Sequence, residues 1–137
     1  MLGAALLLTG LMLIPGCAPT PENGNTLKAE AVATAYVARF RDDNHETPDT
    51  SDVGAFFLRS GCLVFVSDGG TSYLPVFPRA TQLVRSGDGG WQLLVGGKAV
   101  VEGRHYRVKG GEGQYSWLDP AVPPGCPARQ FLVGEVR

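Results

Sequence analysis

From residue 55 onward, the chain alternates short apolar runs with clusters of turn-forming residues. The runs are rich in Val, Leu, Phe and Tyr, and glycines that favour hairpin turns separate them. The segments are AFFLRSGCLVFV (55–66), TSYLPVFP (71–78), TQLV (81–84), WQLLVGG (91–97), KAVVEG (98–103), RHYRVKGG (104–111), GQYSWL (113–118) and ARQFLVGEV (128–136). Several short strands joined by such turns predict a mainly β domain over residues 55–137.

The pattern also constrains individual strands. The prolines of TSYLPVFP cannot donate a ladder hydrogen bond, which confines that strand to an edge or a bulge. In RHYRVKGG, Tyr106 and Val108 fall on one face and Arg107 and Lys109 on the other. Segment 119–127, DPAVPPGCP, is a predicted loop.

Residues 26–54 form a different region. TLKAEAVATAYVARFRDD, 26–43, is Ala-rich with apolar residues near helical spacing, which favours a short helix capped by Asn25 or Thr26. Its Val, Tyr and Phe residues suit an extended strand equally well. The acidic stretch 41–52 around His45 offers oxygen ligands for a cation such as calcium, but it lacks EF-hand spacing, and we interpret it as a solvated loop.

The first sixteen residues predict an export signal. Residues 2–14 are uncharged and leucine-rich, and this run is shorter than the roughly 20 residues that a membrane span needs. Ile14, Pro15, Gly16 and Cys17 resemble the lipobox of bacterial lipoproteins. By that resemblance, residues 1–16 are cleaved and Cys17 is acylated. The segment before the run carries no Lys or Arg, which departs from the usual pattern, and an uncleaved anchor or buried helix with a chance cysteine is the alternative.

The lipoprotein resemblance implies a location. Acyl chains contribute about 0.8 kcal/mol per buried methylene, so lipid alone can hold the protein on a membrane. Residues 17–25 then form a polar tether. Because Ala18 rather than aspartate follows the cysteine, the family's sorting rule implies the outer membrane, facing the periplasm, in a diderm host. We expect a protein of the cell envelope.

Export also bears on the other cysteines. With Cys17 acylated, Cys62 and Cys126 remain, and an even pair in an exported chain predicts a disulfide bond. The prediction rests on compartment and parity. Two free thiols are the alternative; a thiol metal site is disfavoured because neither histidine has suitable spacing.

The expected fold is a small antiparallel barrel of five to six strands, preceded by one short helix. Closure would remove the unpaired edges that an open sheet of this size leaves. Strand number, glycine-rich turns and size resemble the OB-fold. Segments such as CLVFVSDGGTSYLPVFP and VEGRHYRVKGGEG are also similar to those of small bacterial lipoproteins, a likeness that implies fold and location but no activity.

Charge and motifs limit the functions. The formal net charge is −1 with both signs interspersed, so no nucleic-acid partner is expected. The glycine-rich stretches VGGKAV and KGGEGQ match no phosphate-binding motif, and no cofactor is predicted. No serine lies in a GxSxG motif, and the available bases are His45, in the loop, and His105, in a strand.

Aromatic residues offer a second type of site. Tyr115 and Trp117 border glycine- and proline-rich loops, where ligand-contacting residues tend to lie, so we predict them as binding residues. Phe77, Trp91 and Tyr106 are expected to fill the core, although a stacking platform for sugars is the alternative.

Two hypotheses of function follow. The first is a non-catalytic envelope lipoprotein that binds a protein or a glycan, or that has a structural role. The second is an envelope enzyme that uses His45 or His105 as a base.

Overall fold

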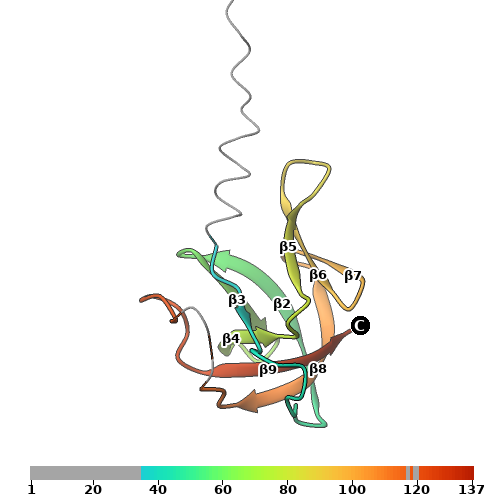
Figure 1. Ribbon diagram of the computed structural model, residues 1–137. Helices are drawn as coiled ribbons and strands as arrows, with labels where there is room; N and C mark the ends of the chain where they lie inside the picture. The colour runs from blue at the N-terminus through green and yellow to red at the C-terminus, as the bar shows by residue number, and fades with distance from the viewer. Residues whose placement is uncertain (1–34, 117, 119–120) are drawn as a thin grey trace, which may run out of the picture.

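The structure is a computed structural model that describes residues 35–116, 118 and 121–137. The described residues form strands and loops without a helix, and no helix among them is long and apolar enough to cross a membrane. In chain order the strands are β1 (Ala38–Arg39), β2 (Ser51–Arg59), β3 (Cys62–Ser67), β4 (Ser72–Phe77), β5 (Gln82–Arg85), β6 (Trp91–Val95), β7 (Lys98–Val101), β8 (His105–Gly113) and β9 (Gln130–Val136). The mainly β prediction is confirmed (Figure 1).

The expected helix over 26–43 is wrong for its described part. Residues 26–34 lie outside the described residues, and residues 35–43 are extended or irregular, with β1 at their centre. Tyr36, Ala38 and Phe40 pack into one cluster, whereas Val37 between them packs into the other. This period of two is that of a strand, and burial of large side chains on both faces outweighs the helix propensity of the alanines.

Six strands form one mixed sheet in the order β1-β4-β3-β2-β8-β9, and β9 also pairs with β4. The pairs β2–β3, β3–β4, β2–β8 and β8–β9 are antiparallel. Five strands that alternate in direction bring the first and last into the same direction, so the closing β4–β9 pair must be parallel, as observed. The expectation of a wholly antiparallel sheet is therefore wrong.

The strands β5, β6 and β7 form a separate three-stranded sheet, which was not foreseen (Figure 1). Its residues Trp91, Leu93, Val95 and Val100 are buried in the same cluster as the inward side chains of the larger sheet. The two sheets therefore share one core, and its other members include Phe56, Leu63, Phe65, Phe77, Tyr106, Val108, Phe131 and Val133. Core filling by Phe77, Trp91 and Tyr106 is confirmed.

A second, smaller apolar cluster covers the outer side of β4 and β9. Leu74, Val76 and Leu132 point away from the main core and are covered by residues 36–40 and by the β8–β9 loop. The short strand expected over 113–118 is not formed in its described part: β8 ends at Gly113, and residues 114–116 and 118 belong to that loop. Its side chains Tyr115 and Leu118 pack against the outer cluster.

Pro75 explains where β4 changes partners. The β3–β4 ladder ends at Tyr73, whereas β1 pairs with β4 only from Val76. The N–H of Leu74 donates towards β9, to the carbonyl of Arg129. Because successive N–H groups of a strand point to opposite sides, the nitrogen of Pro75, which has no hydrogen, faces the gap between these two ladders. The proline is thus tolerated in a strand that is not an edge.

A β-bulge lies in β8, between Lys109 and Gly110. Gly110 has a φ of 137°, and a Cβ there would collide with the carbonyl oxygen of Leu132 in β9. Only glycine allows β8 to bend here and continue pairing with β9.

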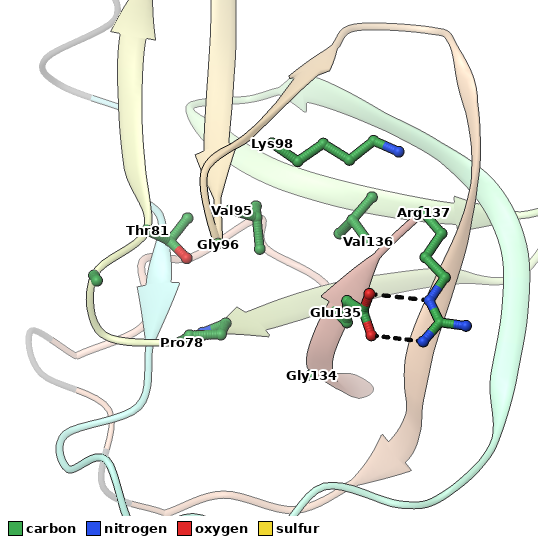
Figure 2. Close-up of a pocket in the computed structure, with 10 residues that line it drawn as sticks. Pro78, Thr81, Val95, Gly96, Lys98, Gly134, Glu135, Val136 and Arg137 are labelled. Carbon is green, nitrogen blue, oxygen red and sulfur yellow. Dashed lines mark hydrogen bonds and ion pairs between the residues drawn. The ribbon is translucent and has the colours of Figure 1, made fainter.

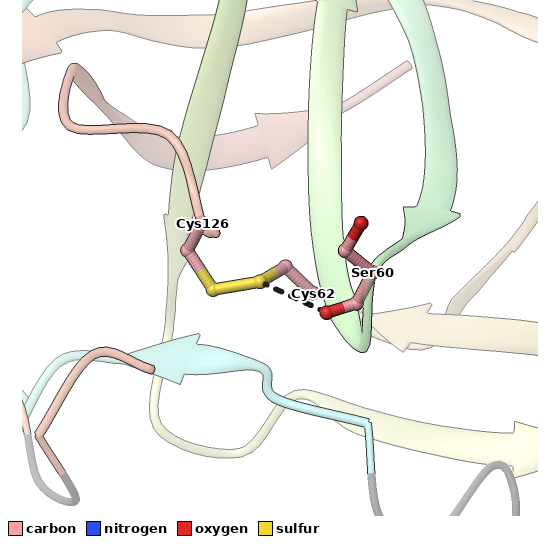
Figure 3. The surroundings of a disulfide bond; sticks show 3 residues. All are labelled: Ser60, Cys62 and Cys126. Atoms are coloured by element: carbon pink, nitrogen blue, oxygen red, sulfur yellow. Dashed lines mark hydrogen bonds between the residues drawn. A yellow bond between two sulfur atoms is a disulfide. The ribbon is translucent and has the colours of Figure 1, made fainter. Parts of the chain in front are cut away.

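The predicted disulfide bond between Cys62 and Cys126 is present (Figure 3). Their Cα atoms are 5.7 Å apart, and the cysteines are separated by 64 residues. Cys62 is buried at the start of β3, and Cys126 belongs to the loop that covers the outer cluster. The bond therefore fixes this loop to the sheet.

We predict that replacing both cysteines, Cys62→Ala with Cys126→Ala, lowers the free energy of unfolding by about 4 kcal/mol, because the unfolded chain regains the entropy of a long loop. The midpoint of urea unfolding measures the change. Adding a reductant should weaken the wild-type protein by a similar amount and leave the double variant unaffected. Equal stability of wild type and variant without reductant would contradict the assigned role of the bond.

Candidate functional site

The residues predicted to bind lipid or ligand are only partly within the described chain. Cys17 and Trp117 lie outside the described residues. Tyr115 is half-buried, and its hydroxyl accepts a hydrogen bond of 2.9 Å from the backbone N–H of Arg41. Its ring meets Phe40 edge-on, at 4.9 Å between centroids. The chain itself thus engages Tyr115, whose contact with a ligand stays a prediction.

Glu112 and Arg129 form an ion pair at the base of the β8–β9 loop. The Arg129 guanidinium donates two hydrogen bonds to the carboxylate, of 2.8 and 2.5 Å, and lies 5.2 Å from the centre of the Tyr73 ring. These hydrogen bonds lower the pKa of Glu112 from its ordinary value of 4.5. The pair joins Glu112, near the end of strand β8, to Arg129, the residue that precedes β9.

The ring of His45 contacts an aromatic side chain and a backbone carbonyl. Its ring stacks on Phe40 at 3.5 Å between centroids, and Nδ1 lies 3.1 Å from the carbonyl oxygen of Asp42. Within the described part of the chain, no three His, Cys, Asp or Glu side chains are grouped closely enough to hold a metal ion.

His105, the first residue of β8, has a carboxylate partner. Its Nδ1 lies 2.8 Å from Oδ1 of Asp68, which belongs to the turn between β3 and β4. Both side chains are exposed, at 65% for His105 and 51% for Asp68. A proton on Nδ1 donated to Asp68 leaves Nε2 free as an acceptor.

This pair borders a depression of about 520 Å³ on the outer face of the larger sheet, which we call the outer dish. Ala55 of β2 forms its floor, because it is the cross-strand neighbour of both Val66 in β3 and His105 in β8. A methyl group between two larger side chains leaves a hollow. The outer dish is lined by Ala55, Phe57, Arg59, Val66, Ser67, Asp68 and His105.

The wall of the outer dish opposite His105 and Asp68 comes from side chains at alternate positions of β2. Ala55, Phe57 and Arg59 share one face of the strand, and Phe56 between them is buried in the core. The Arg59 guanidinium carbon lies 4.8 Å from the centre of the Phe57 ring. One guanidinium and one carboxylate therefore face the same hollow, so its formal charge is balanced when His105 is neutral.

The sequence indicated only part of this site. His105 was a candidate base, but its partner Asp68 was not singled out. Phe57 and Arg59 were missed, although the alternation in AFFLR was available as a signal. Their proximity to His105 depends on the β2–β8 pairing, which joins strands far apart in the sequence.

No protein-family model, curated protein or solved structure significantly matches the chain.

We predict that Glu112 titrates below its ordinary pKa of 4.5 and that Arg129→Gln raises its pKa, because the guanidinium hydrogen bonds are lost. A folded-state pKa below the unfolded one means that the pair stabilises the fold above the unfolded pKa, and that this contribution disappears as the pH falls through the folded-state value. NMR titration of the Glu112 carboxyl carbon measures it. The matched control is Arg137→Gln, which breaks the pair with Glu135 and should leave Glu112 unchanged. An unchanged titration in Arg129→Gln would refute the assignment.

Proposed function

We propose that the chain is a lipid-anchored, non-catalytic binding protein of the cell envelope, and that its outer dish binds a glycan. The observation that carries this proposal is the composition of the dish: an apolar floor and an aromatic ring, surrounded by hydrogen-bonding groups whose charges cancel.

The anchor is inferred from the lipobox-like stretch before Cys17. The Cys62–Cys126 bond supports an oxidising compartment outside the cytoplasm, but weakly. In this proposal, the polar segment that follows Cys17 connects the lipid to the folded domain.

The strand order supports an OB-like barrel. Starting from β2, the ring runs β2-β3-β4-β9-β8, which is first, second, third, fifth and fourth in order along the chain once β5–β7 is treated as an insertion. This is the order of the OB-fold, including a parallel pair between its third and fifth strands. We infer that the closed ring is a small barrel of that type.

The position of the dish supports a binding role. OB-folds commonly bind oligonucleotides or oligosaccharides on the outer face around the second and third strands. Here residues 36–40 and the β8–β9 loop cover the outer side of β4. The outer dish uses β2, β3 and β8, next to the covered area, so the free part of the binding face is displaced by one strand.

The chemistry of the dish favours a sugar over a nucleic acid. Phe57 and Val66 offer apolar surface for the C–H faces of a sugar ring, and Arg59, Asp68 and His105 can hydrogen-bond its hydroxyls. A phosphate backbone needs an excess of cations, whereas the dish holds one guanidinium opposite one carboxylate.

The second candidate is an enzyme with His105 as a base, favoured by the 2.8 Å contact with Asp68. Product analysis after incubation with envelope glycans separates the two functions. Cleavage that is lost in His105→Ala would establish the enzyme, and unaltered glycan supports the binding protein.

We predict that peptidoglycan fragments or other envelope glycans on an array bind the protein, and that Arg59→Ala and Asp68→Asn each weaken binding about tenfold, the effect of losing about 1.4 kcal/mol of interaction. Both side chains are exposed, so the fold should persist, as circular dichroism can verify. Val101→Ala, an exposed apolar position on β7, is the control and should bind as wild type does. Absence of glycan binding, or equal binding by all variants, would count against the proposal.

We predict that protein from membranes of a native-like host has a mass that begins at Cys17, carries acyl groups and lacks the two thiol hydrogens of Cys62 and Cys126. Cys17→Ala should abolish acylation and release the domain from the membrane fraction, because no acyl chain then holds it. Intact mass spectrometry under non-reducing conditions gives the result. An unacylated chain that retains Met1 would exclude the anchor.

A further inference from the structure

Three arginine side chains gather at a pocket beside the end of β1, apart from the outer dish. The pocket has a volume of about 340 Å³ and is lined by Arg39, Phe40, Arg41 and Arg79. Phe40 is only 1% exposed, so the arginines supply almost all of the accessible lining. We call this site the arginine pocket.

The pairing of β1 with β4 brings the three arginines together. The two strands are parallel, and Arg39 lies opposite Phe77. The N–H of Phe40 donates to the carbonyl of Phe77 at 2.9 Å, which continues the ladder by one residue. Arg41 and Arg79 each come two residues after the last strand pair, so both lie where β1 and β4 end. Phe40 is buried in the outer cluster, and the arginines on either side of it line the pocket instead.

Backbone contacts fix two of the arginines. Nε of Arg39 donates to the carbonyl of Thr81 at 2.7 Å, which leaves its terminal amino groups available to a ligand. Arg79 belongs to the turn between β4 and β5, which a hydrogen bond of 3.0 Å from the N–H of Thr81 to the carbonyl of Pro78 closes. Figure 2 shows Pro78 and Thr81, the residues at the two ends of this turn.

Tyr115 lies next to the arginine pocket. Its hydroxyl accepts a hydrogen bond of 2.9 Å from the N–H of Arg41, and its ring packs edge-on against Phe40. The aromatic residue that the sequence suggested for ligand binding therefore supports the backbone of the pocket without lining it.

No carboxylate of the described residues forms an ion pair with these arginines. The ion pairs of the described chain use other carboxylates, those of Asp49, Asp68, Glu112 and Glu135. Asp42 and Asp43 follow Arg41 in the chain, but they neither line the pocket nor pair with its arginines. The lining thus holds three guanidinium groups and no carboxylate.

Three guanidinium groups around one small pocket favour a particular kind of anion. A guanidinium is planar and always charged, and it binds the oxygens of phosphates or carboxylates with parallel N–H bonds. A phosphate monoester carries roughly 1.5 to 2 negative charges at pH 7 and has three terminal oxygens, one for each guanidinium. A carboxylate, a sulfate ester or a phosphodiester carries a single charge, so each neutralises less of the pocket.

We propose that the arginine pocket binds the phosphate group of a phosphate monoester. The guanidinium groups of Arg39, Arg41 and Arg79 donate to the phosphate oxygens. A lipid headgroup and a soluble compound can both carry such a phosphate, and they give different results in the test of the source. The outer dish shares no residue with this pocket, so neither proposal depends on the other.

Three small probes test the charge and the number of oxygens: methyl phosphate, methyl sulfate and dimethyl phosphate. Methyl sulfate keeps three terminal oxygens with one charge, and dimethyl phosphate has two terminal oxygens and one charge. Each is titrated into the full chain in zwitterionic micelles at constant ionic strength, above the second phosphate pKa of about 6. We expect methyl phosphate to shift the NMR amide signals of Arg39, Arg41 and Arg79 saturably. The two monoanions should bind at least about fivefold more weakly.

Substitutions identify the groups that bind. Arg41→Gln and Arg79→Gln should each weaken the binding of methyl phosphate about fivefold or more, because each removes one charged donor. Both side chains are exposed, so the fold should persist. Arg79→Lys keeps the charge but loses the planar donor group, and it should still bind more weakly than wild type. The control Arg104→Gln removes an exposed cation that does not line the pocket, and it should bind as wild type does.

The source of the phosphate is tested with the same full chain. Phosphatidate in the micelles presents a lipid phosphate monoester, and dissolved glycerol 3-phosphate presents the same group without acyl chains. Saturation of the three amide shifts at a lower phosphate concentration with phosphatidate assigns the pocket to a lipid. Saturation at an equal or lower concentration with glycerol 3-phosphate assigns it to a soluble compound. With either ligand, Arg79→Gln should need a higher concentration.

The proposal fails if methyl phosphate causes no saturable shifts at these three amides. It also fails if methyl sulfate or dimethyl phosphate binds as tightly as methyl phosphate. Equal weakening by Arg104→Gln and Arg79→Gln would likewise overturn it, because the anion would then respond to the general surface charge and not to a site. None of these results changes glycan binding at the outer dish, so the two proposals fail separately.

Discussion

The parallel pairing of β4 with β9 is the constraint on which the rest of the structure depends. It joins only Leu74, Pro75 and Val76 to residues 130–132, yet it turns an open sheet into a closed ring. Closure gives the inward side chains a common interior. The β3–β4 ladder ends at Tyr73, and the stretch 36–40 contacts both strands where they separate. Without that stretch, the backbone groups of the gap would lack partners.

The same closure explains the disulfide bond and the long loop. A hairpin of a few residues could join β8 to β9, but the described part of the connection instead covers the outer side of β4 and β9 with Tyr115, Leu118 and Cys126. A loop that covers a sheet gains only from the few side chains it buries, and its ordering entropy opposes it. The Cys62–Cys126 bond also restricts the unfolded chain, so less of that entropy remains to be lost on folding. The Glu112–Arg129 pair holds the base of the loop in the folded state.

Local patterns sufficed for the strands, and long-range pairing set the limit of the sequence analysis. Glycine-rich turns between β-rich runs indicated most of β2 to β9, and parity of the cysteines gave the correct bond. The sequence could not favour an extended form of residues 36–40 over a helix. Tyr36 and Ala38 pack into one apolar cluster and Val37 into the other, and both clusters form from strands far away in the sequence. Likewise, no local sequence pattern indicates that β5, β6 and β7 pair with one another in a separate sheet instead of with the other strands.

The candidate sites were harder to predict for the same reason. A histidine base was visible at His105, but the outer dish requires Ala55 to lie between β3 and β8, which is a property of register. The outer dish lies beside the part of the sheet where residues 36–40 and the β8–β9 loop cover β4.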